Sequence, residues 1–509
     1  MKLKINNISK IFDKLSIIYL YYNKINQNIL YYGDDINKTS KNYRKLLFLI
    51  PLITIISILI SMKISIYFIL INFINIFIYL YPIIITEVKK NEQKKAIEDE
   101  LIVFLLFAYI NSFLGKSLYK TFEEISNSVV FKGLKKEAAL LVKEVEVLGK
   151  SSILAIESRA RVHKNDSLGK VYSTYLAGEN IGISLQERIR DLIEESLDNL
   201  KSSLESYVNR ANDIVEILFM LYLVTPMVLL AFQFISSSIN LFMLLIPLFF
   251  SPGIYLMITL SQPNVGYNVA LTTKEKLILL CLPLAIGLLL LRINLLYDII
   301  IVYALFTIFT FFVYNRIKSS DDILHTMPNI LSDIADYVKL GYGVRNSLLK
   351  LNEKNLDTKT TKFIGKVKEL VKRDLPLTRL NTNSWVLNAV LEFLDNLEKK
   401  GYADSFIFKE ISILIGNYIT LREKILRNLQ LFNSLSIATP FLLYFAFDVL
   451  SKIKSVGNLD PIVAIYSIVL GIIYAKLSRF TIFNFPLFLL LAISLSIIIF
   501  LGGLFMNFL

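Results

Sequence analysis

One kind of stretch constrains the fold of this chain most: a polar helical sequence that runs without a breaker into an apolar one. Between Gln186 and Ile235 the apolar residues recur at spacings of three and four, which keeps one face of a helix apolar. No Gly or Pro occurs in this stretch before Pro226. At ~1.5 Å per residue, the stretch predicts a rod of roughly 75 Å whose second half is apolar enough to enter lipid.

The same plan recurs later in the chain. From Ile407 to Leu450 an amphipathic helical pattern again runs into an apolar sequence, this time one that contains Pro440. Such a helix can carry a movement of a polar domain directly to a membrane span, because no flexible linker separates the two. The sequence therefore predicts two polar helical domains that are rigidly connected to spans.

Composition places the chain among membrane proteins. A hydrophobic fraction of 54 % is too high for a soluble globular chain of 509 residues, so we expect an all-α, polytopic membrane protein. Its one cysteine, Cys281, excludes a disulfide within a single chain. His163 and His325 are too few for a His-based zinc site, and each is expected to be an ordinary surface residue. The net charge of +13 is attributed to membrane orientation rather than to nucleic-acid binding.

In chain order the sequence predicts six segments. They are a cytosolic N-terminal segment (1–45), a pair of transmembrane helices (46–85), a first polar helical domain (89–213), four transmembrane helices (217–314), a second polar helical domain (316–430) and three transmembrane helices (431–509). The first domain carries nineteen basic and nineteen acidic residues, and the second carries nineteen and fourteen. About nine spans and the positive flanks put the N-terminus and both polar domains in the cytosol of a cell-membrane protein.

The two polar domains share a sequence pattern. The stretch that begins at Glu100 aligns without a gap with the stretch that begins at Thr326, so that Gly115 falls on Gly341. A small residue follows two positions later, and in the second copy this residue is Gly343. The glycine is expected to end one helix and the small residue to let the next helix pack back on it, as an αα-hairpin requires.

The far ends of the two domains also correspond. Thr225-Pro226 in LYLVTPMVLLAF falls on Thr439-Pro440 in LSIATPFLLYFAF. Pro226 and Pro440 are candidate hinges, and packing kinks are an equal alternative. Matching segments at both ends predict that the two domains arose by duplication.

These features together resemble a known family. An apolar helix, a Leu-Gly-x-[Ser/Gly]-[Leu/Val] pattern opening an amphipathic helix, a small helical domain and a Pro-containing span resemble the F domain of type II secretion systems. Two such domains behind an N-terminal span pair resemble the archaeal platform protein of type IV pilus-like machines, including the archaellum. The resemblance covers about residues 89–450. It implies a homodimeric platform in the lipid bilayer that works with a cytosolic hexameric secretion ATPase and with pilin or archaellin subunits.

The sequence offers no catalytic machinery of its own. It contains no G-x-x-x-x-G-K-[ST], H-E-x-x-H, C-x-x-C or G-x-S-x-G motif. We therefore expect no enzyme activity and no catalytic, cofactor-binding or metal-binding residues, so an ATPase would be a separate polypeptide.

Basic residues give the second polar domain its surplus charge. The candidates for docking an acidic face of the ATPase are Arg345, Lys366, Lys368, Lys372 and Arg373. The alternative is a solvated helix face near anionic lipid headgroups.

A second class of function stays open. Glu216, Asp298 and Asp448 lie at the ends of expected spans, where water reaches them, which favours a scaffold over a carrier. The alternative function is a multi-span transporter or permease, and a bacterial platform of the same family is a third possibility.

Overall fold

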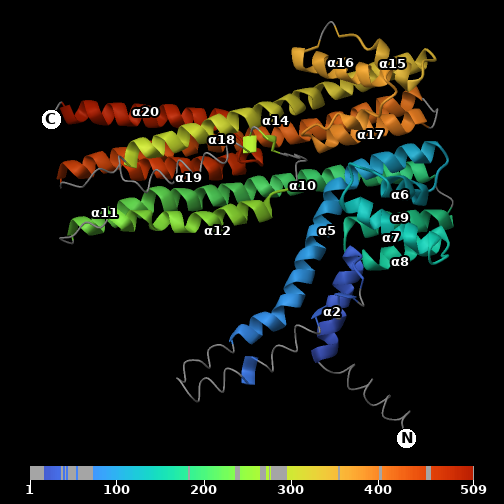
Figure 1. The fold of residues 1–509 in the computed structure, drawn as a ribbon, viewed down its shortest axis with the longest axis horizontal. Coiled ribbons are helices and arrows are strands. Elements are labelled where there is room, and N and C mark those ends of the chain that lie inside the picture. The colour runs from blue at the N-terminus through green and yellow to red at the C-terminus, as the bar shows by residue number, and fades with distance from the viewer. Residues whose placement is uncertain are drawn as a thin grey trace. The chain divides into compact units, whose positions relative to one another are not determined.

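The computed structural model describes residues 17–35, 38–39, 42–43, 53–55, 73–181, 184–235, 241–263, 271–273, 275–276, 295–353, 356–399, 404–453 and 460–507. Every regular element in this part of the chain is a helix, which confirms the all-α fold (Figure 1). The chain divides into two compact units, Met1–Ser196 and Leu197–Leu509.

The first unit packs short helices around the second half of one long helix. Its elements are α2 (Ile17–Tyr32), α5 (Phe73–Phe113), α6 (Leu118–Ser126), α7 (Gly133–Glu146), α8 (Ser152–Val162), α9 (Ser167–Ile181) and the first residues of α10 (Leu185–Phe219). Aromatic rings join these helices: Phe104 of α5 lies 4.6 Å from Phe122 of α6, which in turn lies 5.5 Å from Tyr172 of α9. The core thus surrounds the second half of α5, where nearly all side chains from Leu101 to Ile110 are buried.

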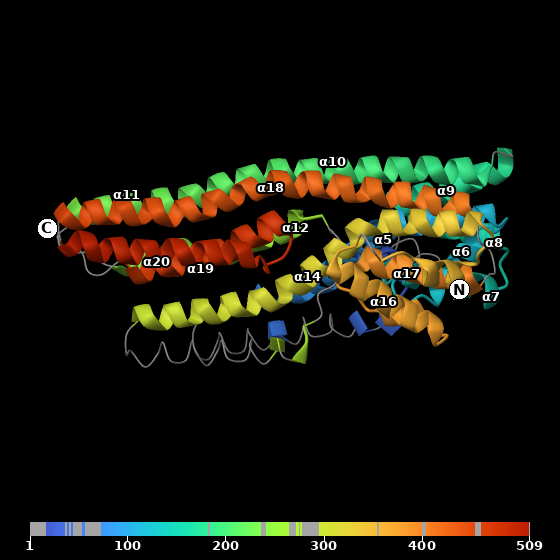
Figure 2. The ribbon, with the colours of Figure 1, turned by 90° about the horizontal axis from the view of Figure 1, so that it is seen from above.

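The second unit joins a polar group of helices to an apolar bundle. It holds the rest of α10, the π-helical turn η2 (Met220–Val224), α11 (Thr225–Ile235), the 3₁₀ turn η3 (Leu241–Leu245), α12 (Ile246–Ser261), α14 (Leu295–Lys339), α15 (Val344–Lys350), α16 (Thr358–Lys372), the 3₁₀ turn η4 (Leu377–Arg379), α17 (Trp385–Lys399), α18 (Ser405–Ile453), α19 (Asp460–Arg479) and α20 (Phe485–Asn507). Figure 2 shows α18 as one unbroken ribbon that lies beside α19 and α20 at its apolar end.

The turn after α5 has a helix-ending geometry that requires glycine. Gly115 has φ +67°, its N–H donates to Ser112 O (3.1 Å), and the N–H of Lys116 donates to Asn111 O (2.9 Å). This is the Schellman arrangement, in which a residue in the left-handed region closes the last helical turn. The chain then reverses and α6 begins after Ser117.

The turn after α14 repeats this geometry bond for bond. Gly341 has φ +87°, its N–H donates to Val338 O (2.9 Å), and the N–H of Tyr342 donates to Tyr337 O (3.2 Å). Gly343 then caps α15 with φ −67° and ψ 161°, against −69° and 162° for the residue that caps α6. The aligned sequence positions therefore have the same local backbone structure.

The two proline segments differ in their helical register. Residues 186–235 are helical throughout, but the π-helical turn η2 comes directly before Thr225-Pro226, and the Thr225 hydroxyl donates to Met220 O (3.0 Å). In α18 the helix continues through Pro440, and the Thr439 hydroxyl donates to Leu435 O (2.8 Å). A π turn inserts one extra residue where a proline cannot donate its N–H.

Five helices of the described chain are long and apolar enough to cross a membrane. The qualifying segments are Leu185–Leu229, Met243–Ser261, Ile300–Lys339, Ser405–Phe447 and Pro461–Arg479, and Phe485–Ile497 is a shorter apolar helix. Within the expected transmembrane segments 46–85 and 217–314, residues 46–52, 56–72 and 277–294 lie outside the described residues. Glu216 is exposed, and the side chains of Asp298 and Asp448 lie outside the described part.

Tyrosine hydroxyls tie the apolar bundle of the second unit together. Tyr207 of α10 donates to Leu477 O (3.0 Å), and Tyr303 of α14 donates to Phe488 O (2.7 Å). A hydroxyl buried among apolar helices needs a protein partner because hydrocarbon supplies none. These bonds therefore fix α19 and α20 against the long helices.

Candidate functional site

Two helices of the second unit, α14 and α18, connect its polar helices to its apolar bundle. Near the middle of the pair, Arg422 Nη2 donates to Asp321 Oδ1 (3.1 Å), and the Arg422 side chain is only 8 % exposed. Further out, the Ser412 hydroxyl donates to Pro328 O (2.7 Å). Removing one partner of a shielded ion pair costs about 3–5 kcal/mol, so these contacts hold the two helices in register.

Arg345, a candidate docking residue, is committed to contacts within its own unit. Its Nη2 and Nε donate to Val371 O (2.8 and 3.1 Å), and its Nη1 donates to Glu398 (2.8 Å) and to Asp374. The guanidinium thereby satisfies a carbonyl in the last turn of α16 and bridges to α17. Arg345 therefore fastens α15 to its neighbours.

Lys368 is engaged in a similar way. Its Nζ donates to Leu351 O (2.9 Å) and to Glu353 Oε1 (2.6 Å), and its side chain is 20 % exposed. It closes the loop that connects α15 and α16.

The other three candidates lie on the open face of α16 and at its end. Lys366 and Lys372 are exposed, and so is Arg373, which pairs with Glu369 one turn earlier on the same helix (2.6 Å). An exposed pair of this kind is worth less than about 1 kcal/mol, so a partner can displace it. Of the five candidates, the three are the ones available to a docking protein.

The first unit contains a buried cluster of charged side chains. The apolar stripe of α7 consists of Leu134, Ala138 and Leu141, and Glu137 lies among them with no exposed surface. Facing it from α8 is Arg159, with a side chain 5 % exposed. A carboxylate in a core remains ionised only when it is paired and hydrogen-bonded.

The cluster is fully connected. Arg159 Nε and Nη2 donate to the two oxygens of Glu137 (2.8 and 2.5 Å). The His163 ring lies between two carboxylates, with Nε2 3.1 Å from Glu137 and Nδ1 2.7 Å from Asp166. The Tyr172 hydroxyl donates to Glu137 (3.0 Å). Four elements, α7, α8, α9 and the α8–α9 turn, contribute to one network.

Opposite charges set the pKa values in this cluster. Burial acts to raise the pKa of Glu137, but the Arg159 and His163 charges hold that pKa well below its ordinary value. Burial likewise acts to lower the pKa of His163, and the Glu137 charge with the Asp166 hydrogen bond raises it instead. The His163 hydrogen bond lowers the pKa of Asp166 against the effect of burial. With His163 protonated, two positive and two negative charges balance.

A glycine allows the α8–α9 turn to close on the cluster. The Asp166 carboxylate accepts from the N–H of Gly169 (2.9 Å) and so caps the first turn of α9. A Cβ atom at Gly169 would lie 1.8 Å from the carbonyl oxygen of His163. Only glycine fits this approach of α9 to the end of α8.

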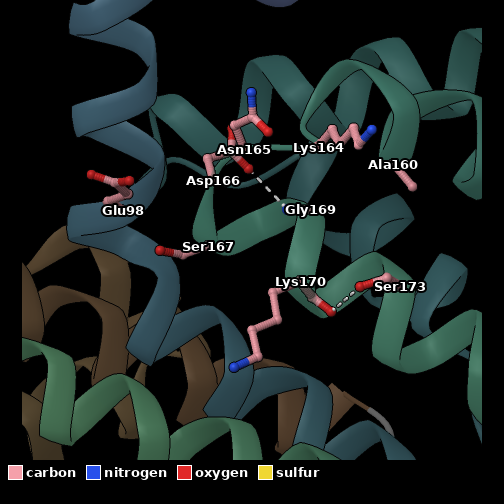
Figure 3. A pocket seen from close by; sticks show the side chains of 9 residues that line it. All are labelled: Glu98, Ala160, Lys164, Asn165, Asp166, Ser167, Gly169, Lys170 and Ser173. Atoms are coloured by element: carbon pink, nitrogen blue, oxygen red, sulfur yellow. Dashed lines mark hydrogen bonds between the residues drawn. The ribbon is translucent and has the colours of Figure 1, made fainter.

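An open polar pocket adjoins the cluster at Asp166. Its volume is about 670 Å³, and it is lined by Glu98, Ala160, Lys164, Asn165, Asp166, Ser167, Gly169, Lys170 and Ser173. Figure 3 shows Glu98 on α5 and the bond from Gly169 to Asp166 on the opposite wall. Burial raises the pKa of Glu98. In the described chain no group of His, Cys, Asp and Glu has the arrangement of a metal site.

The expectation that both histidines are surface residues was wrong for His163, whose side chain has no exposed surface. His325 is 39 % exposed and lies 3.1 Å from Glu423. The signal missed was an acid on the apolar stripe of α7 together with Arg159, His163 and Asp166 at spacings of four and three. These spacings place the Arg159 guanidinium, the His163 imidazole and the Asp166 carboxylate on one side of the C-terminal end of α8.

Comparisons with known proteins find a distant relative and do not show a family. A segment of 177 residues, 34 % of the chain, is 24 % identical to the uncharacterized protein MJ1286 of Methanocaldococcus jannaschii. The match spans 28 % of that protein's length. No protein-family model matches the chain, and no solved structure matches it significantly.

Proposed function

We propose that this chain is a non-enzymatic membrane platform for assembly of a type IV pilus-like filament, a pilus or an archaellum. The observation that carries the proposal is the continuity of α14 and α18, helices of 45 and 49 residues that begin or end among polar helices and continue into apolar ones. At ~1.5 Å per residue, each helix extends roughly 70 Å. A stiff connection of this length suits a protein that transmits movement rather than one that performs chemistry.

A duplicated F-type domain is part of the same proposal. The matching hydrogen-bond patterns around Gly115 and Gly341 support it. The aligned pairs Thr225-Pro226 and Thr439-Pro440 support it as well. In this proposal both polar domains face the cytosol, and the platform acts as a homodimer. A hexameric secretion ATPase moves the polar domains, and the long helices convey that movement to spans that lift pilin or archaellin subunits from the bilayer.

The exposed basic residues Lys366, Lys372 and Arg373 are the proposed contact for an acidic face of the ATPase. Reversing all three to glutamate should reduce recovery of the ATPase with the purified platform at least tenfold. The matched control reverses three exposed cations of the first polar domain, Lys136, Lys143 and Arg161. Equal recovery from the two triple variants would remove this contact from the proposal.

Deleting the gene and counting surface filaments by electron microscopy tests the function as a whole. The platform proposal expects loss of filaments and their return when the intact gene is supplied. Unchanged filaments together with altered solute uptake would instead favour the transporter.

A further inference from the structure

The long helix α5 of the first unit has a weak point where its apolar half meets its polar half. Pro82 lies inside the helix and has no N–H to donate, so the helical ladder is interrupted there. The Thr86 hydroxyl donates to the carbonyl oxygens of Pro82 (2.7 Å) and Ile83 (3.0 Å), which further loosens the local backbone pattern. The polar half begins at the next residue, Glu87. A movement passed along α5 alone would therefore be absorbed by bending at Pro82.

The short helix α2 lies across this weak point. Two of its isoleucines, Ile25 and Ile29, are fully buried and form an apolar cluster with Tyr79 and Ile83, which lie on either side of Pro82. These contacts hold the α5 segments before and after the proline against one face of α2.

Polar contacts add to this apolar one. Asn28 of α2 is 2 % exposed, and its amide donates to Glu87 Oε2 (3.0 Å) and to Thr86 Oγ1 (3.4 Å). Lys24 lies 3.9 Å from the same Glu87 carboxylate. These bonds act at the first polar residues of α5 after the proline, Thr86 and Glu87, about one helical turn beyond it.

The last turn of α2 also contacts the buried charge cluster. Arg159 donates to the carbonyl oxygens of Leu30 (3.2 Å) and Tyr31 (3.5 Å), which lie in the last turn of α2. A cation at a helix C-terminus also interacts favourably with the helix dipole. The Tyr31 hydroxyl donates to Asp166 (2.5 Å), and its ring lies 4.5 Å from the ring of His163.

We propose that α2 is a splint: a second, non-covalent connection that joins the α7–α8–α9 bundle to the apolar segment of α5 and bypasses the bend at Pro82. The buried cluster binds the last turn of α2, and the adjacent pair Ile25 and Ile29 packs against α5 on both sides of the proline. The splint is a property of the first unit itself, and only its purpose in filament assembly rests on the proposed function.

The test is hydrogen exchange of the full chain in lipid nanodiscs, read by mass spectrometry. The variant Asn28→Leu/Tyr31→Phe removes the side-chain bonds of α2 to Glu87 of α5 and to Asp166 of the cluster, and it leaves the Arg159–Glu137 pair intact. Amides of α2 and of residues 79–90 should exchange at least tenfold faster in this variant, while those of α7 and α8 stay unchanged. The matched control, Asn23→Leu/Tyr81→Phe, changes the same residue types at an exposed and a half-exposed position and should exchange as the wild type does.

A second variant tests whether α2 acts by bridging the proline. In a Pro82→Ala background the same double variant should still free α2, but residues 79–90 should keep their protection because the helix no longer needs a splint. Fast exchange of α2 with no change in residues 79–90 when Pro82 is present would overturn the proposal, and so would equal exchange in the double variant and its control. The measurement uses no filaments, so its failure is distinct from failure of the platform function.

Discussion

The Nη2 atom of Arg159 lies 2.5 Å from Oε2 of Glu137, and the two side chains are 5 % and 0 % exposed. A pair so deeply buried is costly to break from one side, because the remaining charge is shielded from water and has lost its main counter-ion. The stability of the first unit therefore depends on both side chains of this pair.

Replacing one partner of the pair should therefore destabilise the bundle strongly. Arg159→Met leaves the Glu137 carboxylate without its main partner and should lower the local unfolding free energy of α7 and α8 by about 3–5 kcal/mol. Native-state hydrogen exchange of the full chain measures this quantity. The double variant Glu137→Gln/Arg159→Met should lose less than Arg159→Met alone, since the amide needs no counter-ion. Arg161→Met, at a 78 % exposed position on the same helix, should change the same quantity by less than about 0.5 kcal/mol.

The cluster should also make the first unit sensitive to alkaline pH. The pKa of His163 is raised in the folded state, so its contribution to stability is fully present below the unfolded pKa of about 6.5 and is lost as pH rises through the folded value. The groups that face His163 are Glu137 of α7, Arg159 of α8, Asp166 of the α8–α9 turn, Tyr172 of α9 and Tyr31 of α2.

The two carboxylates act in the opposite direction. The pKa values of Glu137 and Asp166 are lowered, so their contribution is present above their ordinary values of about 4 and is lost as pH falls through the folded ones. Protection of α7 and α8, corrected for intrinsic exchange, should thus fall on both the alkaline and the acid side. His163→Gln should remove the alkaline fall, and His325→Gln should leave it in place. An unchanged alkaline profile in His163→Gln would contradict the assignment.

The left-handed glycines of the two hairpins should tolerate substitution poorly. Gly115→Ala and Gly341→Ala should each cost about 1 kcal/mol, because an L side chain disfavours positive φ, although open space surrounds both positions. Gly416→Ala within α18 is the control, since Gly416 has no positive φ and the same open surroundings, and it should be neutral or stabilising. Hydrogen exchange around each substituted position measures these effects, and equal losses at Gly341 and Gly416 would contradict the stated cause.

A different physical cause acts at Gly169. Gly169→Ala should disrupt the α8–α9 turn, because the new Cβ would lie 1.8 Å from the carbonyl oxygen of His163 and the turn must open. We expect loss of protection in α8 and α9 together with weaker contact of Tyr31 with Asp166. Gly365→Ala on α16 meets nothing within 4 Å and should be neutral or stabilising by about 0.5–1 kcal/mol. Similar losses of protection in Gly169→Ala and Gly365→Ala would show that crowding against the His163 carbonyl is not the cause of the effect at Gly169.

Local patterns in the sequence determined the helices and their ends. Spacings of three and four predicted the helical stretches 186–235 and 407–450, and the aligned glycines predicted the turns at Gly115 and Gly341. These features depend on residues within a few positions of one another, where helical periodicity and backbone sterics act directly. The π-helical turn before Pro226 was not predicted. The aligned sequence before Pro440 stays α-helical, so the shared pattern does not distinguish the two backbone conformations.

Only the tertiary structure decided which side chains meet across long separations. Arg345 resembled a docking residue in the sequence, yet its partner Glu398 lies 53 positions away and engages it within the unit. Tyr31 and Asp166 are 135 positions apart, and nothing in their local sequence predicts that they bond. Periodicity reports which face of a helix is apolar, whereas the partner of a buried charge is set by how whole helices pack. The sequence alone therefore determined the long helices. The packing of whole helices determined which side chains bond between helices in each unit.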